Sequence, residues 1–153
     1  ALRELRRFAN EPVALPTGLY WDALRLFHEI VEGLRAAGRA TPRLEGVAID
    51  TWGVDFGLLG EDGALIENPR HYRDPRTRGV PDELCRIVPR EEIYRATGIQ
   101  FMELNSLCQL YAIRRQAPWL LERPATLLFM PDLFNYWLSG RKVSEFTIAT
   151  TTQ

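Results

Sequence analysis

Apolar residues at intervals of three and four positions predict one long helix near the start of the chain. The residues that share this spacing are Leu24, Phe27, Val31 and Leu34. Such a stripe is typical of the buried face of an amphipathic helix. Asp22 precedes it as a favoured N-cap, and Gly38 suits the position just after a helix end. Before this helix, residues 2–8 fit either a strand or a frayed helical turn, and residues 16–18 favour a turn.

Short apolar runs in the middle of the chain predict strands. Residues 46–50 form a β-rich run bounded by turn residues, and residues 54–59 form a second one. The Gly-Glu-Asp-Gly sequence at residues 60–63 is typical of a hairpin turn, after which residues 64–66 return as a strand. A further strand is expected over residues 126–130.

Helices alternate with these strands in the second half of the chain. The pattern predicts helices over residues 80–87, 89–97, 105–116 and 131–139, several of them opened by Pro or ended by Gly. Residues 68–79 are polar and irregular. The order of elements indicates one α/β domain built in layers.

Composition excludes several protein classes. The chain has 153 residues, of which 46% are hydrophobic and 25% are charged, as in ordinary globular domains. No apolar run is long enough to predict a membrane span, and the charged N-terminus does not resemble a secretory signal. A net charge of −1 argues against a nucleic-acid partner. Cys85 and Cys108 lack the paired spacing of a zinc site, and we expect both to be reduced in a cytoplasmic protein.

The strongest candidate for a binding site is the segment over residues 50–55. Asp50 and Asp55 flank Trp52 and Gly53 where one predicted strand ends and the next begins, and strand ends present ligands in α/β sheets. Glycine lets a ligand approach the backbone, tryptophan offers a flat face to a sugar ring, and a carboxylate accepts hydrogen bonds from hydroxyls. The alternative is a β-bulge with a packed Trp and a capping Asp.

A second candidate is the donor-rich loop at residues 71–77. This loop can bind an anion or a polar ligand, or it can be a solvated loop in which Arg73 or Arg76 pairs with Asp74. Motifs of serine hydrolases, zinc proteases and P-loop enzymes are absent from the sequence.

Two further segments combine a polar side chain with a helix start. Gln100 and Asn105 can reach a hydroxylated ligand, or Asn105 can cap the helix that follows. Asp132 follows Met130 and Pro131, where an Asp is either a helix cap or a ligand-binding residue.

Taken together and in order, these segments resemble the rhamnulokinases, a group within the FGGY carbohydrate kinases. The W-G-V-D, G-I-Q-F and A-T-T-T-Q elements favour rhamnulokinase over xylulokinase, glycerol kinase and fuculokinase. The resemblance covers nearly the whole chain. The segments that carry it are residues 49–56, 72–77, 98–101, 105–107, 130–134, 145–147 and 149–153.

The resemblance implies an α/β fold of the RNase H-like (actin/hexokinase) type, with a mixed sheet and flanking helices. It implies ATP-dependent phosphorylation, with Mg²⁺, of the 1-hydroxyl of the sugar L-rhamnulose. Carried over by motif, Gly53 contacts the sugar through its backbone, and Trp52 and Asp55 line the same pocket. The remaining residues expected to bind the sugar are Arg73, Gln100, Phe101, Asn105 and Asp132.

The family also has parts that this sequence lacks. A glycine-rich hairpin that grips phosphate and metal opens the family's N-terminal domain, and the catalytic Asp and the adenosine-binding lobe come later in its chain. We therefore expect residues 1–153 to be a partial N-terminal domain without that hairpin or the C-terminal lobe. The catalytic Asp is expected beyond Gln153, and neither a metal site nor kinase activity is expected of the chain alone.

Missing first strands would leave a sheet edge without its partner, which predicts marginal stability or self-association of the isolated chain. Two alternatives stay open. One is another FGGY sugar kinase, of the fuculokinase or xylulokinase type. The other is a stand-alone sugar-binding module.

Overall fold

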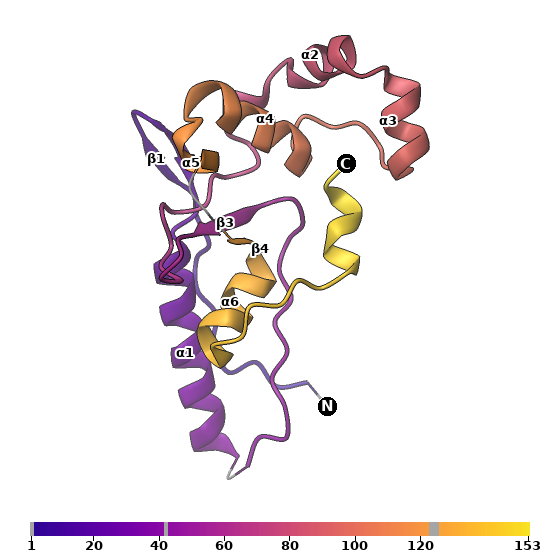
Figure 1. Cartoon of the computed structure of the whole chain (residues 1–153). Helices are drawn as coiled ribbons and strands as arrows, with labels where there is room; N and C mark the ends of the chain where they lie inside the picture. Colours follow the sequence, from indigo (N-terminus) through magenta and orange to yellow (C-terminus); the bar gives the residue numbers. More distant parts are fainter. Residues whose placement is uncertain (1, 42, 123–125) are drawn as a thin grey trace.

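The computed structural model describes residues 2–41, 43–122 and 126–153 (Figure 1). In the view of Figure 1, α1 runs down one side of the molecule, and α2, α3 and α4 lie together at its upper end. The strands are β1 (Val13–Leu15), β2 (Gly18–Tyr20), β3 (Phe56–Leu59) and β4 (Thr126–Phe129). The α-helices are α1 (Ala23–Ala40), α2 (Val80–Ile87), α3 (Arg90–Thr97), α4 (Ser106–Gln116), α5 (Trp119–Glu122) and α6 (Met130–Ser139), and the 3-10 turns are η1 (Pro75–Thr77) and η2 (Thr147–Thr151).

The first two strands form an antiparallel hairpin around the predicted turn, with Val13 opposite Tyr20. Backbone hydrogen bonds also join the second strand and the residue after it to the polar loop that follows residue 68. Trp21 donates its N–H group to the carbonyl of Pro69 at 2.8 Å, and His71 donates to the carbonyl of Leu19 at 2.9 Å. The N-terminal hairpin therefore holds the start of the loop over residues 71–77.

The central pair of strands is β3 and β4, which run antiparallel with Phe56 opposite Phe129. The turn predicted over residues 60–63 is also present, but residues 64–66 form an isolated bridge between Leu65 and Leu59 and not the predicted strand. Gly60 donates its N–H group to the carbonyl of Ala64, and Ile66 donates to the carbonyl of Leu58, both at 2.9 Å. The main partner of β3 is nevertheless β4, a strand that comes much later in the chain.

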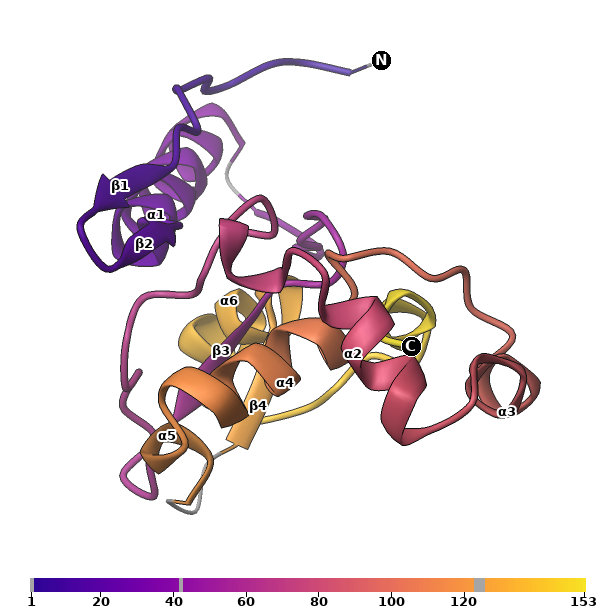
Figure 2. The ribbon, with the colours of Figure 1, turned by 90° about the horizontal axis from the view of Figure 1, so that it is seen from above.

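Helices cover both faces of the β3–β4 pair (Figure 2). Phe56 and Leu58 point to one face, where they pack with Ile113 of α4 and Leu120 of α5. On the other face, Leu133 of α6 lies so close to Gly57 that an added Cβ would come within 3.0 Å of it. Because side chains alternate along a strand, the four residues of β3 contribute to the hydrophobic clusters on both faces of the strand pair. Full burial of each large apolar side chain contributes about 1.5–3 kcal/mol.

The strand predicted over residues 46–50 is wrong. This segment has no regular structure, and Val47 is 52% exposed. A strand is held by hydrogen bonds to a neighbouring strand, and the pairings found in the described residues join β1 to β2 and β3 to β4. Apolar composition alone cannot supply that partner. The strand predicted over residues 54–59 is confirmed for its last four residues, which form β3.

The helix predicted after Asp22 is present, but its buried face and its end differ from the prediction. Leu24 is 62% exposed, whereas Ala23, Leu26 and Glu29 are buried. The carboxylate of Glu29 is paired with Arg6 and Arg25, which allows it to lie inside. The helix runs through Gly38, whose position is open, and ends at Ala40, with Thr41 as its C-cap. Thr41 is extended, as expected of a residue before proline.

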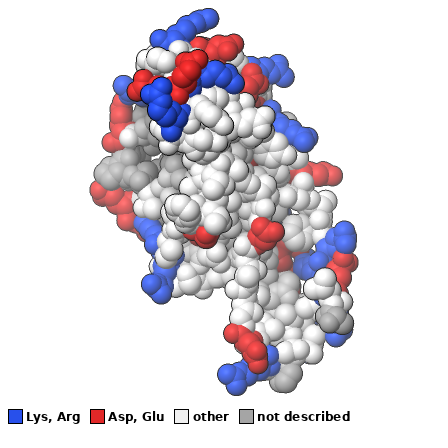
Figure 3. All heavy atoms as spheres, turned by 90° about the vertical axis from the view of Figure 1, so that its right-hand side faces the viewer, with Lys and Arg blue, Asp and Glu red and all other residues white. Residues whose placement is uncertain are grey.

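No helix within the described residues is long and apolar enough to cross a membrane. Both cysteines are free, as expected, with Cys85 half-buried and Cys108 buried. Burial raises the pKa of the Cys108 thiol to about 11, so this thiol is protonated at neutral pH. Charged side chains of both signs gather towards the ends of the face in Figure 3 and leave its middle largely uncharged.

Candidate functional site

A fully buried carboxylate, Asp55, lies at the centre of the candidate site. Its Oδ2 atom accepts hydrogen bonds from the indole Nε1 atoms of Trp21 at 2.5 Å and of Trp52 at 2.9 Å. The same oxygen accepts from the backbone N–H of Tyr72 at 3.2 Å, and Oδ1 accepts from Nε2 of Gln109 at 2.8 Å. One side chain therefore joins the N-terminal hairpin, the W-G-V-D segment, the loop over residues 71–77 and α4.

Burial raises the pKa of the Asp55 carboxyl above its ordinary value, while the four donors oppose that shift. The expectation that Asp55 lines the sugar pocket differs from this geometry. Asp55 is 0% exposed, and both of its oxygens are occupied by donors from the protein itself. It holds the surrounding segments together from beneath the surface.

Four aromatic rings pack in a row beside this carboxylate; the His71 ring stacks on Trp21 and on Tyr72, and the rings of Trp21 and Trp52 are tilted by 38°. Ring centroids are 4.1 Å apart between Trp52 and Trp21, 4.0 Å between Trp21 and His71, and 4.6 Å between His71 and Tyr72. The Nδ1 atom of His71 accepts from the backbone N–H of Arg73 at 3.0 Å. Burial lowers the pKa of the His71 imidazole, which favours the neutral ring that this acceptor role requires.

The backbone between Gly53 and Asp55 is strained. Val54 has a φ of 68°, a left-handed conformation that β-branched residues rarely adopt. Val54 donates its N–H group to Oγ1 of Thr151 at 3.2 Å, and its carbonyl accepts from Oγ of Ser106 at 2.7 Å. Gly53 is needed here, because an added Cβ would lie 2.8 Å from Oγ1 of Thr151. The turn is thus fixed from two distant parts of the chain.

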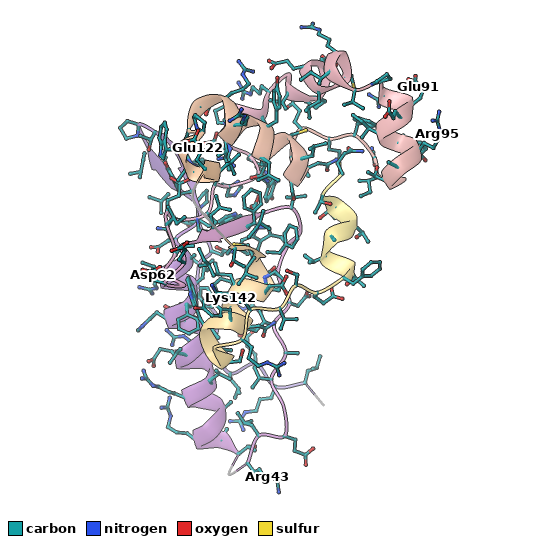
Figure 4. All side chains as sticks on the ribbon, viewed as in Figure 1. Arg43, Asp62, Glu91, Arg95, Glu122 and Lys142 are labelled. Atoms are coloured by element: carbon teal, nitrogen blue, oxygen red, sulfur yellow. The ribbon has the colours of Figure 1, made fainter. Side chains whose placement is uncertain are left out.

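Two open hollows lie beside this region and share Phe101. One hollow, of about 690 Å³, lies between residues 72–78 and 101–104 and includes Arg73 in its lining. The other, of about 480 Å³, is lined by Gln100 and residues of α3. The guanidinium of Arg90 lies 4.2 Å from the centroid of the Phe101 ring between them. On the outer side of α3, Arg95 points away from the molecule (Figure 4).

Trp52 and Asn105 are placed differently from the residues of these hollows. Trp52 lines a third hollow of about 410 Å³ against α1. Asn105 is fully buried and makes no capping hydrogen bond with its side chain. Its amide nitrogen instead donates to the carbonyl of Gln100 and to Oε1 of Gln153, both at 2.7 Å. It therefore ties the G-I-Q-F segment to the A-T-T-T-Q segment.

Asp132 serves a different part of the fold. It is buried in the first turn of α6, and both of its oxygens accept from the backbone N–H of Glu145 at 3.3 Å. Burial raises the pKa of its carboxyl. Asp132 therefore fixes the segment that leads to η2, while Phe129 occupies the N-cap position of α6.

The loop over residues 71–77 lacks the side-chain pairing of Arg73 or Arg76 with Asp74 that one of its two alternatives predicted, and binding of a ligand by this loop stays a prediction. Asp74 is buried and accepts from the backbone N–H groups of Leu19 at 2.6 Å and Arg76 at 2.9 Å. The side chain of Arg76 turns to Gln109 instead, at 2.8 Å. Arg73 is exposed, with its guanidinium 5.3 Å from the Tyr72 ring.

Sequence reasoning missed Trp21, Gln109 and Thr151 as members of this site. Gln109 lies four residues after Asn105, a spacing that puts both on one face of the helix predicted over residues 105–116; in the structure Asn105 is the N-cap of α4. That spacing was the only available signal, because nothing local shows that this face meets Asp55.

Metal binding finds no support among the described residues. No three His, Cys, Asp or Glu side chains within them gather closely enough to hold an ion. The carboxylates of Asp55 and Asp132 are both occupied by N–H donors. These residues do not fit the magnesium ion that the resemblance implies.

Comparison with known proteins identifies the family. The pattern of the FGGY family of carbohydrate kinases, N-terminal domain, matches residues 16–153. The chain is 43% identical to a rhamnulokinase of Bacteroides thetaiotaomicron and 40% identical to one of Oceanobacillus iheyensis, each over 99% of this chain. It spans 31% and 32% of the length of these two relatives.

The fold matches solved kinases as well. The crystal structure of a gluconate kinase from Lactobacillus acidophilus superposes with a TM-score of 0.84 at 14% identity, over 95% of this chain and 30% of that one. This likeness confirms the predicted α/β kinase-lobe fold. With a family pattern that matches most of its length, the chain belongs to the FGGY family of carbohydrate kinases and carries sequence of their N-terminal domain.

Proposed function

We propose that this chain is part of a longer ATP-dependent carbohydrate kinase that phosphorylates the 1-hydroxyl of L-rhamnulose. Identity to the two rhamnulokinases, 43% and 40% over 99% of the chain, carries this proposal. Identity to the solved gluconate kinase is 14%, although the fold is shared. In this proposal the chain supplies a wall of the sugar-binding site.

The surface around the W-G-V-D segment suits a neutral, hydroxylated ligand. Gly53 is half-buried, and the strained turn at Val54 gives its backbone one orientation. Gln100 and Arg73 are exposed polar residues on either side of the Phe101 ring. We propose that Arg73 and Gln100 bind sugar hydroxyls and that Phe101 covers an apolar face of the sugar. Gly53 completes this wall, and Trp52, which lines the hollow against α1, flanks it. Asp55 and Asn105 support the wall from inside, and Asp132 fixes the segment that leads to η2.

ATP and Mg²⁺ would be bound by other parts of the longer protein, because the described residues here offer no group of metal ligands. We therefore propose that the 153-residue chain alone transfers no phosphate. An enzyme that uses ATP and a free sugar is expected in the cytoplasm.

The test is a kinase assay on the longer protein, with ADP release measured against L-rhamnulose, L-fuculose and xylulose. We expect kcat/KM for L-rhamnulose to exceed the other two by roughly ten-fold or more, the discrimination that a few sugar contacts provide. Preference for L-fuculose or xylulose would overturn the substrate assignment, and absence of any phosphorylation would overturn the kinase itself.

A matched pair of variants tests the proposed wall. Arg73→Ala should raise the KM for the sugar, whereas Arg86→Ala, an exposed arginine on α2, should leave it unchanged. Equal effects of the two substitutions would remove Arg73 from the site.

A further inference from the structure

Gln109 belongs to none of the sequence motifs, yet its side chain makes several hydrogen bonds to the candidate site. It lies on α4 and is 2% exposed. Its Nε2 atom donates towards Oδ1 of Asp55 at 2.8 Å, the carbonyl of Leu104 at 3.1 Å and the carbonyl of Val54 at 3.3 Å. Its Oε1 atom accepts from Nη2 of Arg76 at 2.8 Å. One amide thus contacts all three loops that hold the proposed sugar-binding residues.

The chemistry of these contacts requires a glutamine. Three acceptors surround the nitrogen and a guanidinium faces the oxygen, so the side chain must donate on one side and accept on the other. A glutamate at this position would place a second carboxylate against Asp55. A leucine would leave Asp55 and Arg76 each without one buried partner, and such unpaired groups are costly.

The contact to Val54 is the one that bears on sugar binding. Val54 has a φ of 68° and adjoins Gly53. Its carbonyl is held by Gln109 and by Oγ of Ser106, at 3.3 Å and 2.7 Å. Backbone strain persists only where surrounding contacts hold it, and it is concentrated at functional sites. Without these donors, the peptide groups around Gly53 would relax to an ordinary conformation.

We propose that Gln109 is a positioning residue for the sugar. It holds the Gly53–Asp55 turn and the Arg76 loop in the arrangement that presents the Gly53 backbone to the ligand. This inference rests on the proposed kinase function and adds a residue that supports its sugar-binding wall from behind.

The experiment uses the longer kinase with Gln109→Leu, Gln109→Glu and the control Gln116→Leu, which makes the same change at an exposed position of the same helix. We expect Gln109→Leu to raise the KM for L-rhamnulose roughly ten-fold, while the KM for ATP stays within about two-fold of wild type. Gln109→Glu keeps the acceptor for Arg76 but loses the donor to Val54, so it should raise the sugar KM to a similar extent. Gln116→Leu should change neither constant.

A rescue variant separates positioning from general loss of structure. Glycine adopts a positive φ without strain, so adding Val54→Gly to Gln109→Leu should recover part of the sugar KM. A sugar KM within about two-fold of wild type in Gln109→Leu, or no recovery in the double variant, would overturn the positioning role in an active enzyme. An inactive wild-type enzyme would overturn the proposed function, and with it this inference.

Discussion

Trp21 and Trp52 pack with their ring centroids 4.1 Å apart and their planes tilted by 38°, and both donate their indole N–H group to the same oxygen of Asp55. The first residue lies between β2 and α1, and the second lies in the W-G-V-D segment. Trp21 and Asp55 are 34 positions apart in the chain. This shared acceptor explains how a glycine turn without regular structure is held in place.

Loss of the Asp55 charge should destabilise the fold. In Asp55→Asn, one oxygen can still accept from the two indoles, but the new NH₂ group faces the NH₂ group of Gln109. We expect the free energy of unfolding to fall by about 1–3 kcal/mol, the cost of unsatisfied buried polar groups. Urea denaturation followed by tryptophan fluorescence measures this change.

The matched control for that variant is Asp50→Asn, the same change at an exposed position nearby. Its free energy of unfolding should stay within about 0.5 kcal/mol of wild type. Equal stabilities of the two variants would show that Asp55 does not hold the site together.

Gly53 and Thr151 should behave as a coupled pair. A Cβ at residue 53 would lie 2.8 Å from Oγ1 and 3.2 Å from Cγ2 of Thr151. We expect Gly53→Ala to cost about 1–3 kcal/mol in wild type and less in a Thr151→Ala background, because both clashing atoms are then gone. A double-mutant cycle should give a coupling of at least about 0.5 kcal/mol.

Gly33→Ala is the control for the glycine change. Position 33 lies inside α1 with open space around it, so alanine there should stabilise the helix by about 0.5–1 kcal/mol. Additive effects of Gly53→Ala and Thr151→Ala would contradict the contact between residues 53 and 151.

His71 should make stability depend on pH. Burial lowers the pKa of its imidazole in the folded protein, whereas in the unfolded chain the pKa is about 6.5. The unfolded state therefore binds a proton first as the pH falls, and the stability that neutral His71 contributes is lost below about pH 6.5.

His71→Asn tests this dependence, because its side-chain oxygen can still accept from Arg73 but does not titrate. The stability advantage of wild type over this variant should shrink between about pH 7.5 and about pH 5, as measured by urea denaturation. An advantage that is constant or grows on acidification would refute the assignment of His71 as a buried neutral ring.

Asn105 should control the order of the A-T-T-T-Q segment. Its amide donates to Gln100 and Gln153, both at 2.7 Å. We expect Asn105→Ala to cost about 1–2 kcal/mol and to speed amide hydrogen exchange over residues 147–153. Asn135→Ala, an exposed change on α6, is the control, and equal exchange in both variants would contradict this role.

Residues close together in the sequence were enough to predict a helix end where that end depends on a single turn. Gly98 and Gly140 end α3 and α6 in left-handed conformations, as their positions in the sequence indicated. A cap acts through the hydrogen bonds of its own turn, so sequence is sufficient there. The buried side of α1 was not predictable in this way, because the charge of Glu29 is compensated by Arg6, from a distant segment.

The family, the α/β class and the positions of most helices could be predicted from the sequence, since these follow from motif order, hydrophobic spacing and capping residues. The tertiary structure was needed to find the surroundings of Asp55, a residue that the sequence predicts to line the sugar pocket and that lies fully buried. It also decided that residues 46–50 are not a strand and that Trp21, Gln109 and Thr151 surround the glycine turn. Each of these depends on which distant backbone and side-chain groups meet, because a buried carboxylate, a strained φ and a strand are each stabilised by partners far away in the chain.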